Sequence, residues 1–225
     1  SNATPFKMYQ NIGATMNRGI EVSVNTVNVD NKNFKWNSTL TFAANHEEIT
    51  DLIDGKDIIG SDSHITTSLL IGRPLKSFYH FINEGIWQEN EAEEAAKYFK
   101  DSKKTQPFKP GDIKLRDLNG DYIIDDKDET YLGSQSPKWT GGFNNNFSYK
   151  NFDVSMAFQG TIGNDIWNVA KGSLASAGRQ NALADAYTKA WTKDGDLDAE
   201  YPRITNSDSN NNMRGSSFYV ENGSY

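Results

Sequence analysis

The sequence predicts a mainly β protein made of long antiparallel hairpins, with loop insertions that contain short helices. Three observations predict this class. Apolar and polar residues alternate with a period of two in four stretches, short turn-rich links join these stretches in pairs, and a long segment separates the pairs. We expect strands at about residues 18–29, 33–45, 138–150 and 151–163. Each is about twice as long as a usual strand of about five or six residues.

The first expected hairpin has a strand on each side of a turn-rich link. Ile20, Val22 and Val24 alternate with polar residues, and residues 29–33 (Val-Asp-Asn-Lys-Asn) supply the turn. In the second strand, the apolar positions share one face that only Ser38 interrupts: Phe34, Trp36, Leu40, Phe42 and Ala44. We therefore expect a strand pair with one apolar face.

The second expected hairpin repeats the pattern around Lys150 and Asn151. Its apolar positions are Trp139, Phe143, Phe147, Tyr149, Phe152, Val154, Met156, Phe158 and Ile162. The polar positions hold Asn, Thr, Ser and Gln more often than long charged residues. Alternation alone also fits a soluble β-sandwich, whereas long strands, aromatic strand ends and unequal connections are typical of a transmembrane β-barrel. Both architectures stay open at this level.

Two long insertions, at about residues 46–137 and 164–216, complete the chain. In the first, residues 68–88 are apolar and aromatic and predict one or two β segments. Residues 89–103 predict a helix with acids at its start and lysines at its end. In the second insertion, residues 163–193 predict helix. Because a pair of antiparallel strands returns the chain to its starting side, both insertions lie at the same end of the sheet, opposite the short links.

The composition excludes several classes of protein. The net charge is −7 and the Lys and Arg residues are scattered, which argues against nucleic-acid binding. The absence of cysteine excludes disulfides and cysteine zinc sites. No apolar run reaches the length of about 18 residues that a transmembrane helix needs. Residues 1–3 are typical of an expression-tag remnant, which leaves residues 4–225 for fold analysis.

The segment DLNGDYIIDDKD, residues 117–128, has the spacing of a calcium-binding loop. Calcium takes about six to eight oxygen ligands, which such loops supply from their first, third, fifth, seventh and twelfth positions. At the sixth position, where these loops use glycine for a sharp turn, the chain has Tyr122. The expected ligands are Asp117, Asn119, Asp121, Ile123 through its carbonyl, and Asp128.

The alternative for this segment is a solvated acidic turn, because Asp-x-Asn-x-Asp is a short pattern. A bound calcium ion would cross-link the loop, which is a structural role rather than a catalytic one. The paired acids Asp125 and Asp126, and Glu93 and Glu94, are sequence neighbours whose side chains diverge, so they do not form the facing carboxylates of a glycosidase. We expect no enzymatic activity.

Four segments, in this order, carry a family resemblance: NRGIEVSVNTVNVDNKNFKWNSTLTFAANHEEITDL, IGRPLKSFYHFINEGIWQ, the run from KPGDIKLRDLNGDYIIDDKDE to GTIGNDIWN, and SSFYVENGSY. Together they resemble the C-terminal part of the β-barrel of SusC/RagA-type TonB-linked outer-membrane receptors of Bacteroidetes. The resemblance covers the chain from about Asn17 to Tyr225. It departs at Tyr122, where family members commonly have glycine.

This resemblance implies that the chain is a fragment of a TonB-dependent receptor barrel of about 22 strands. It implies an importer in the cell outer membrane that takes up oligosaccharides or peptides with a SusD-like lipoprotein and energy from TonB. The hairpin links would then be periplasmic, and both insertions extracellular. The residues expected to face the outer-membrane lipid are Phe34, Trp36, Phe42, Phe147, Phe152 and Phe158.

The alternative function is a secreted, calcium-stabilised carbohydrate-binding β module. In that case Trp87, Trp139, Trp167 or Trp191 would stack on sugar rings. Recovery of the full-length protein from the outer-membrane fraction would favour the importer. Binding of glycans by the isolated segment would favour the module.

Overall fold

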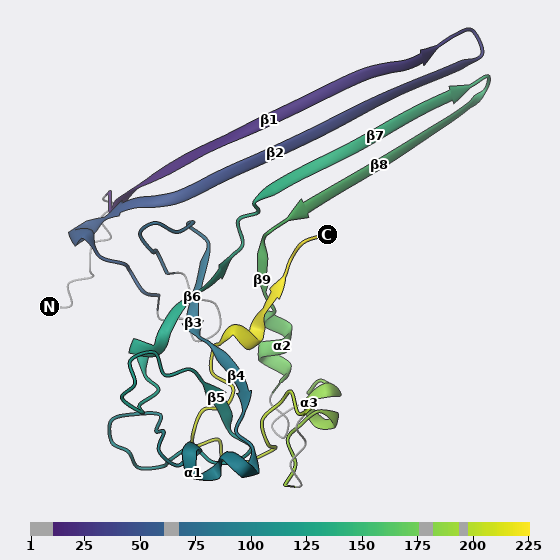
Figure 1. Cartoon of the computed structure of the whole chain (residues 1–225). Helices are drawn as coiled ribbons and strands as arrows, with labels where there is room; N and C mark the ends of the chain where they lie inside the picture. Colours follow the sequence, from purple (N-terminus) through teal and green to yellow (C-terminus); the bar gives the residue numbers. More distant parts are fainter. Residues whose placement is uncertain (1–10, 61–67, 176–181, 194–197) are drawn as a thin grey trace, which may run out of the picture.

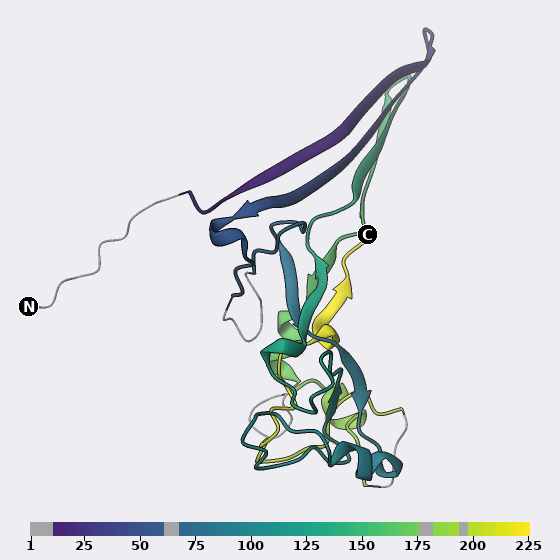
Figure 2. The same cartoon turned by 60° about the vertical axis from the view of Figure 1, so that its left-hand side comes forward.

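The computed structural model describes residues 11–60, 68–175, 182–193 and 198–225. The expected tag remnant at residues 1–3 lies outside this range. The chain has two parts: a long four-stranded sheet, and a module built from the insertions that lies at one end of it (Figure 1). Figure 2 shows the sheet from another side, with the module again at the end opposite the hairpin links.

The sheet contains the two predicted hairpins in the order β1-β2-β7-β8, with all neighbours antiparallel. The two hairpins pair through β2 and β7, so the predicted strands form one surface. Its register places Val24, Leu40, Phe143 and Phe158 in one row across the sheet. The strands are β1 (Gly13–Asp30), β2 (Phe34–Leu52), β7 (Trp139–Tyr149) and β8 (Phe152–Ile162).

The first hairpin is longer than the alternation predicts. β1 begins at Gly13 and β2 continues to Leu52, so the first insertion starts later than residue 46. The additional residue pairs include polar residues, such as Arg18 with His46. Because apolar residues do not alternate there, the pattern does not predict this part of the hairpin. The extension ends where Ile49 and Leu52 become buried.

The two faces of the sheet differ in chemistry, as the alternation predicts. The apolar face is largely uncovered: Phe152 is 76% exposed, Ile20 66% and Phe158 62%. The opposite face carries short polar side chains, among them Ser23, Thr41, Asn144 and Gln159. Phe42 is also exposed, whereas Phe34, Trp36 and Phe147 are half-buried by stacking on one another.

A small hydrogen-bonded cluster interrupts the apolar face near the hairpin links. Asn145 is buried, and its Oδ1 accepts hydrogen bonds from Trp36 Nε1 at 3.0 Å and from Ser38 Oγ at 2.8 Å. Asn28, which lies at a bulge in β1, donates from Nδ2 to Ser38 Oγ at 2.6 Å. The cluster therefore links β1, β2 and β7 through side chains as well as backbone.

The insertion module consists of short paired strands and single helical turns. Its strand pairs are β3 (Ser77–Phe81) with β6 (Glu129–Ser134), β4 (Asn83–Ile86) with β5 (Ile113–Leu115), and β9 (Asp165–Trp167) with β10 (Val220–Asn222). Its helical turns are η1 (Ile53–Gly55), η2 (Glu89–Glu91), α1 (Ala92–Ala95), η3 (Asp126–Asp128), α2 (Val169–Leu174), α3 (Asp185–Thr188) and η4 (Ser217–Tyr219). Among the described residues, no helix is long and apolar enough to cross a membrane.

The helices are shorter than the sequence predicts. The expected helix at residues 89–103 ends at Ala95, because Phe99 pairs with the acidic loop instead: its N–H donates to Tyr122 O and its carbonyl accepts from Ile124 N. The second insertion begins with strand β9 before its helices, and part of the expected helix at residues 163–193 lies outside the described residues. Tertiary pairing overrides local propensity in both places.

The apolar cores lie in the module and not in the sheet. One cluster contains Phe81, Trp87, Ala95, Phe108, Ile113, Leu115 and Ile124. A second cluster contains Phe78, Trp167, Ala175, Ala186, Tyr201 and Tyr219, so it combines residues of both insertions. The module is therefore the part of the chain that folds by burying its own apolar surface.

A fully buried carboxylate joins the two insertions. Asp112 Oδ1 accepts from Arg203 Nη2 at 2.9 Å and from Asn212 Nδ2 at 3.0 Å. Its Oδ2 accepts from Asn210 Nδ2 at 2.7 Å and from Lys109 N at 3.1 Å. Because every partner satisfies the same buried charge, the first insertion and the segment 203–212 hold each other in place.

Candidate functional site

The acidic loop folds into a compact series of turns in which its own side chains cap backbone amides. Asp117 Oδ1 accepts from Gly120 N at 2.7 Å, and its Oδ2 accepts from Tyr122 N at 2.8 Å. Asp121 Oδ1 accepts from Ile123 N at 2.8 Å. These short side-chain to backbone bonds are typical of Asp and Asn in turns, and they bring the predicted ligand residues into one loop.

Asp128, the twelfth residue of the loop, is fully buried. Its carboxylate accepts hydrogen bonds from Leu118 N at 2.8 Å and from Asp125 N at 3.0 Å, so it closes the loop from end to end. Burial raises the pKa of Asp128, the negative charge of Asp117 raises it further, and the backbone hydrogen bonds oppose the rise. The two ends of the loop therefore place like charges near each other.

Tyr122 adopts the left-handed backbone conformation that the sixth position of such a loop requires, with φ of 62°. Its ring packs edge-on against Tyr98 at 5.1 Å between ring centroids, and Tyr98 packs against Trp87 of the first core cluster at 5.3 Å. Tyr122 thus adopts a left-handed conformation that glycine adopts most readily. Its side chain packs the loop against the core through Tyr98.

The structure does not test whether the acidic loop binds calcium. Among the described residues, no group of three or more Asp, Glu, His or Cys side chains is arranged to hold a metal ion. Carboxylate oxygens of Asp117, Asp121 and Asp128 accept bonds from backbone amides. Asn119 Oδ1 does the same for Asp121 N, and Ile123 is half-buried in the same loop.

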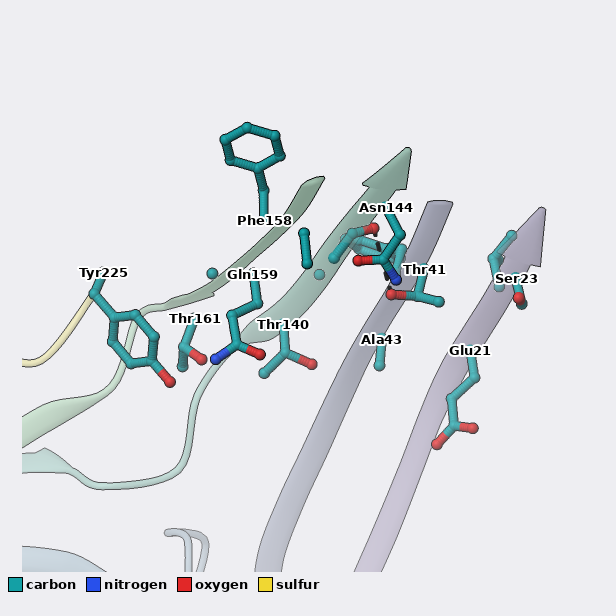
Figure 3. Close-up of a pocket in the computed structure, with 16 residues that line it drawn as sticks. Glu21, Ser23, Thr41, Ala43, Thr140, Asn144, Phe158, Gln159, Thr161 and Tyr225 are labelled. Atoms are coloured by element: carbon teal, nitrogen blue, oxygen red, sulfur yellow. Dashed lines mark hydrogen bonds between the residues drawn. The ribbon is translucent and has the colours of Figure 1, made fainter. Parts of the chain in front are cut away.

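The polar face of the sheet carries a shallow cleft of about 970 Å³ that crosses all four strands (Figure 3). Thr140, Gln159 and Thr161 project from this face, and Phe158 projects from the opposite one. Its lining combines polar side chains, among them Glu21, Asn144 and Gln159, with glycines and apolar residues such as Ala43 and Ala157. Such a surface can hydrogen-bond water or a polar solute along its length.

Three of the four candidate sugar-stacking tryptophans are core residues, which corrects that expectation. Trp87, Trp167 and Trp191 are 4%, 7% and 8% exposed, and Trp191 Nε1 also donates to Gln88 Oε1. Trp139 is 37% exposed, but it lies on the apolar face beside Phe42, with 5.9 Å between ring centroids. Only the alternative function, a carbohydrate-binding module, assigns these indoles to sugar stacking, and it does so from residue type alone; packing determines their role.

The fold defines the class of protein. Long antiparallel strands with an exposed apolar face, a polar opposite face, short links at one end and structured insertions at the other are the features of a transmembrane β-barrel wall. A soluble sandwich would cover the apolar face with a second sheet, and no second sheet covers it among the described residues.

Comparison with known proteins identifies the family. The chain is 34% identical over 221 residues to the TonB-dependent receptor P26 of Formosa agariphila, with 96% of this chain and 21% of the relative covered. It is 27% identical to the TonB-dependent receptor SusC of Bacteroides thetaiotaomicron, with 87% and 19% covered. The chain belongs to the SusC/RagA type of TonB-dependent outer-membrane receptors, and it spans about a fifth of the length of these relatives.

Solved structures show the same fold. The structure of the RagAB peptide transporter superposes with a TM-score of 0.67 at 23% identity, over 97% of this chain and 22% of the other. The RagAB peptide importer in its closed-closed state gives 0.66 over 96% of this chain and 22% of the other, also at 23% identity. No family model matches the chain. These relatives do not favour the alternative of a secreted carbohydrate-binding module.

The sequence reading missed the groups that join the two insertions. Asp112 follows Pro110 and Gly111 in a turn, and its partners Asn210 and Asn212 lie in a polar segment without periodicity. An acid directly after a Pro-Gly turn is a weak signal on its own. Only the fold shows that this carboxylate is buried and satisfied by residues nearly a hundred positions away.

Proposed function

We propose that this chain is part of the barrel wall and extracellular surface of an importer for oligosaccharides or peptides. In this proposal the complete receptor works with a SusD-like lipoprotein at its extracellular mouth and takes energy from TonB. Two findings support the proposal. The chain is similar in sequence to TonB-dependent receptors, SusC among them, and it shares its fold with the RagAB peptide transporter.

The observation that carries the proposal is the two-sided sheet. The apolar face presents Phe158, Val154 and Leu40 to its surroundings, each at least half exposed, and hydrocarbon would cover them in a membrane. β7 and β8 contain 11 residues each. At about 3.3 Å per residue and a tilt of about 45°, such strands rise by about 25 Å, which equals the usual height of the apolar band.

The connections indicate which end of the sheet faces outward. The hairpin links at residues 31–33 and 150–151 are short, as periplasmic turns of outer-membrane barrels are. The module lies at the opposite end and would then be extracellular (Figure 1). It would cover part of the barrel mouth, where an imported solute enters.

Cysteine labelling of the full-length receptor tests this orientation, because this segment contains no cysteine of its own. Tyr187→Cys, in the module, should react with a membrane-impermeant maleimide in intact cells. Asn151→Cys, in a hairpin link, should react only after the outer membrane is permeabilised. The reverse pattern would contradict the orientation, and recovery of the receptor from the soluble periplasm would contradict the importer itself.

We further propose that the acidic loop binds calcium through Asp117, Asn119, Asp121, the Ile123 carbonyl and Asp128. The spacing, the left-handed Tyr122 and the neighbouring charges of Asp117 and Asp128 support this, because a divalent cation would relieve that repulsion. When bound, calcium would cross-link the loop and stabilise the module.

Thermal unfolding with calcium and with chelator tests the metal site. Calcium should raise the melting temperature of the wild-type chain, and Asp117→Asn combined with Asp121→Asn should abolish that rise. Asp153→Asn, an exposed acid on β8, is the matched control and should leave the rise unchanged. An equal rise in the double variant would place the metal elsewhere.

A further inference from the structure

The end of the sheet that lies away from the module brings two turns from different hairpins together (Figure 1). In the first link, Asn31 Oδ1 accepts hydrogen bonds from Asn33 N at 3.1 Å and from Phe34 N at 2.8 Å. This turn leaves Lys32 exposed between the two asparagines. In the second link, Lys150 N donates to Asn33 O at 3.0 Å. Because the backbones of the two links are joined, Lys32 and Lys150 lie at the same end of one surface.

The apolar face ends at this level in a row of aromatic side chains. Phe34, Tyr149 and Phe152 pair with one another across β2, β7 and β8. The next row holds Trp36 and Phe147, whose rings stack with 5.6 Å between centroids. Aromatic residues gather where the apolar band of a membrane barrel meets the lipid headgroups. These two rows therefore place the hairpin links at headgroup level.

The acids at this end of the sheet point to the polar face. Lys35 is one residue away from the aromatic positions of β2, so its side chain points to the polar face, and its Nζ lies 3.6 Å from Asp30 Oδ1. Asp153 alternates with the exposed apolar residues of β8 and points to the polar face as well. Residues 29–36 and 147–154 contain no other acid. Strand alternation thus keeps both carboxylates away from the apolar face.

Lys150, in contrast, lies on the apolar side. Its Nζ is 5.2 Å from the centroid of the Tyr149 ring, which projects from the apolar face. Lys150 and Lys32 are both exposed, and in the described part of the chain no carboxylate lies within ion-pair distance of either ammonium group. The apolar face therefore ends in unpaired cations, with its acids on the other side of the sheet.

We propose that this end of the apolar face binds the phosphate group of an anionic phospholipid in the periplasmic leaflet, with Lys150 and Lys32 as the cationic contacts. The acyl chains of the same lipid would cover the aromatic rows. A zwitterionic headgroup is a poorer match, because its ammonium group would meet two lysines and no carboxylate on this face. This inference rests on the proposed barrel wall and its orientation, and it adds the class of lipid that the wall prefers.

Fluorescence quenching in the full-length receptor tests the lipid site. A bimane label on Asn151→Cys, beside Lys150, reports on the lipids around the hairpin links. The receptor is placed in phosphatidylcholine nanodiscs that contain a small, equal fraction of either nitroxide-labelled phosphatidylglycerol or nitroxide-labelled phosphatidylcholine. Labelled phosphatidylglycerol should quench the bimane more strongly at the same fraction. High salt should reduce the difference, because it screens exposed lysines.

Lysine substitutions separate the two faces of the sheet. Lys150→Gln and Lys32→Gln should each lower the preference for phosphatidylglycerol by about fivefold, the usual contribution of one lysine at an anionic lipid surface. Lys35→Gln is the matched control, because it removes the same charge at the same end but on the polar face, and it should leave the preference unchanged. All three lysines are exposed, and quenching by labelled phosphatidylcholine shows that each variant is embedded in lipid.

Three outcomes would overturn the lipid site: equal quenching by the two labelled lipids, a preference that survives when Lys32 and Lys150 are both replaced, or a loss with Lys35→Gln as large as with Lys150→Gln. Quenching by neither labelled lipid would overturn the barrel wall together with the lipid site. The importer function fails in a different experiment, when the full-length receptor supports no uptake or is absent from the outer membrane.

Discussion

The four-stranded sheet and the insertion module belong to one chain, yet they treat apolar side chains in opposite ways. The sheet directs Phe152 and Phe158 outward, whereas the module encloses Phe78 and Phe108, each 1% exposed. The sheet is held by long ladders of backbone pairs, and the module by two apolar clusters and a buried carboxylate. The difference shows that the two parts of the chain suit different surroundings. The module buries its apolar side chains within the protein, whereas the sheet leaves them exposed on one face.

The largest effect that we expect comes from the charge that joins the insertions. Asp112→Ala removes the acceptor for Arg203, Asn210 and Asn212 and leaves a guanidinium without its partner. The free energy of unfolding of the module should fall by about 3–5 kcal/mol. Denaturant unfolding followed by tryptophan fluorescence measures it, with Asp153→Ala as the exposed control. An unchanged midpoint would show that the insertions do not depend on this carboxylate.

A pair of phenylalanines tests the comparison directly. Phe78→Ala empties a fully buried position in the module and should cost about 3–5 kcal/mol. Phe158→Ala, on the exposed face of the sheet, should change stability in detergent by no more than about 0.5 kcal/mol. Equal losses for the two variants would mean that the sheet also has a protein-packed core, and the distinction between the two parts would be wrong.

Tyr122 gives a smaller effect that separates backbone from side chain. Both Tyr122→Ala and Tyr122→Gly lose the contact with Tyr98, but only glycine adopts a φ of 62° freely. The alanine variant should therefore be less stable than the glycine variant by about 1 kcal/mol. Thermal unfolding in chelator compares them. Equal stabilities would show that the loop changes its backbone conformation when the ring is removed.

The smallest effect concerns pH. Because burial raises the pKa of Asp128 above its usual 3.8, the folded loop favours the protonated acid. The resulting stabilisation is complete below the unfolded pKa and is lost as the pH rises through the folded pKa. In chelator, stability of the module should therefore fall over this window above pH 3.8, and Asp128→Asn should flatten that fall. A fall of the same size in the variant would assign it to another group.

The sheet and the module also differ in how far the sequence reveals them. Alternation around Val22, Leu40 and Phe158 predicts the strands, because every second side chain of a strand points to the same face and that face is apolar here. Pairing of β2 with β7 needs the fold, since it joins residues far apart in the chain. In the module, strands as short as Asp165–Trp167 leave no period to detect, and the expected helix at residues 89–103 yields to the pairing of Phe99.

The candidate sites divide in the same manner. The spacing from Asp117 to Asp128 is local, so the sequence shows it, and the structure adds the left-handed Tyr122 and the buried carboxylate at the end. Lys32 and Lys150 lie in different hairpins, and nothing near either residue marks the two as parts of one surface. Local motifs can be predicted from residues, whereas convergent sites depend on packing.

The module's attachment to β2 has a consequence for the order of assembly. Ile49 exchanges backbone hydrogen bonds with Gly72 and Arg73, and pairing of β3 with β6 brings the chain back toward the start of β7. A module that folds first would shorten the effective loop between Leu52 and Trp139 and reduce the entropy lost when the two hairpins meet. The joining of β2 to β7 would then be a local event, and this long-range pairing would form faster than its sequence separation suggests.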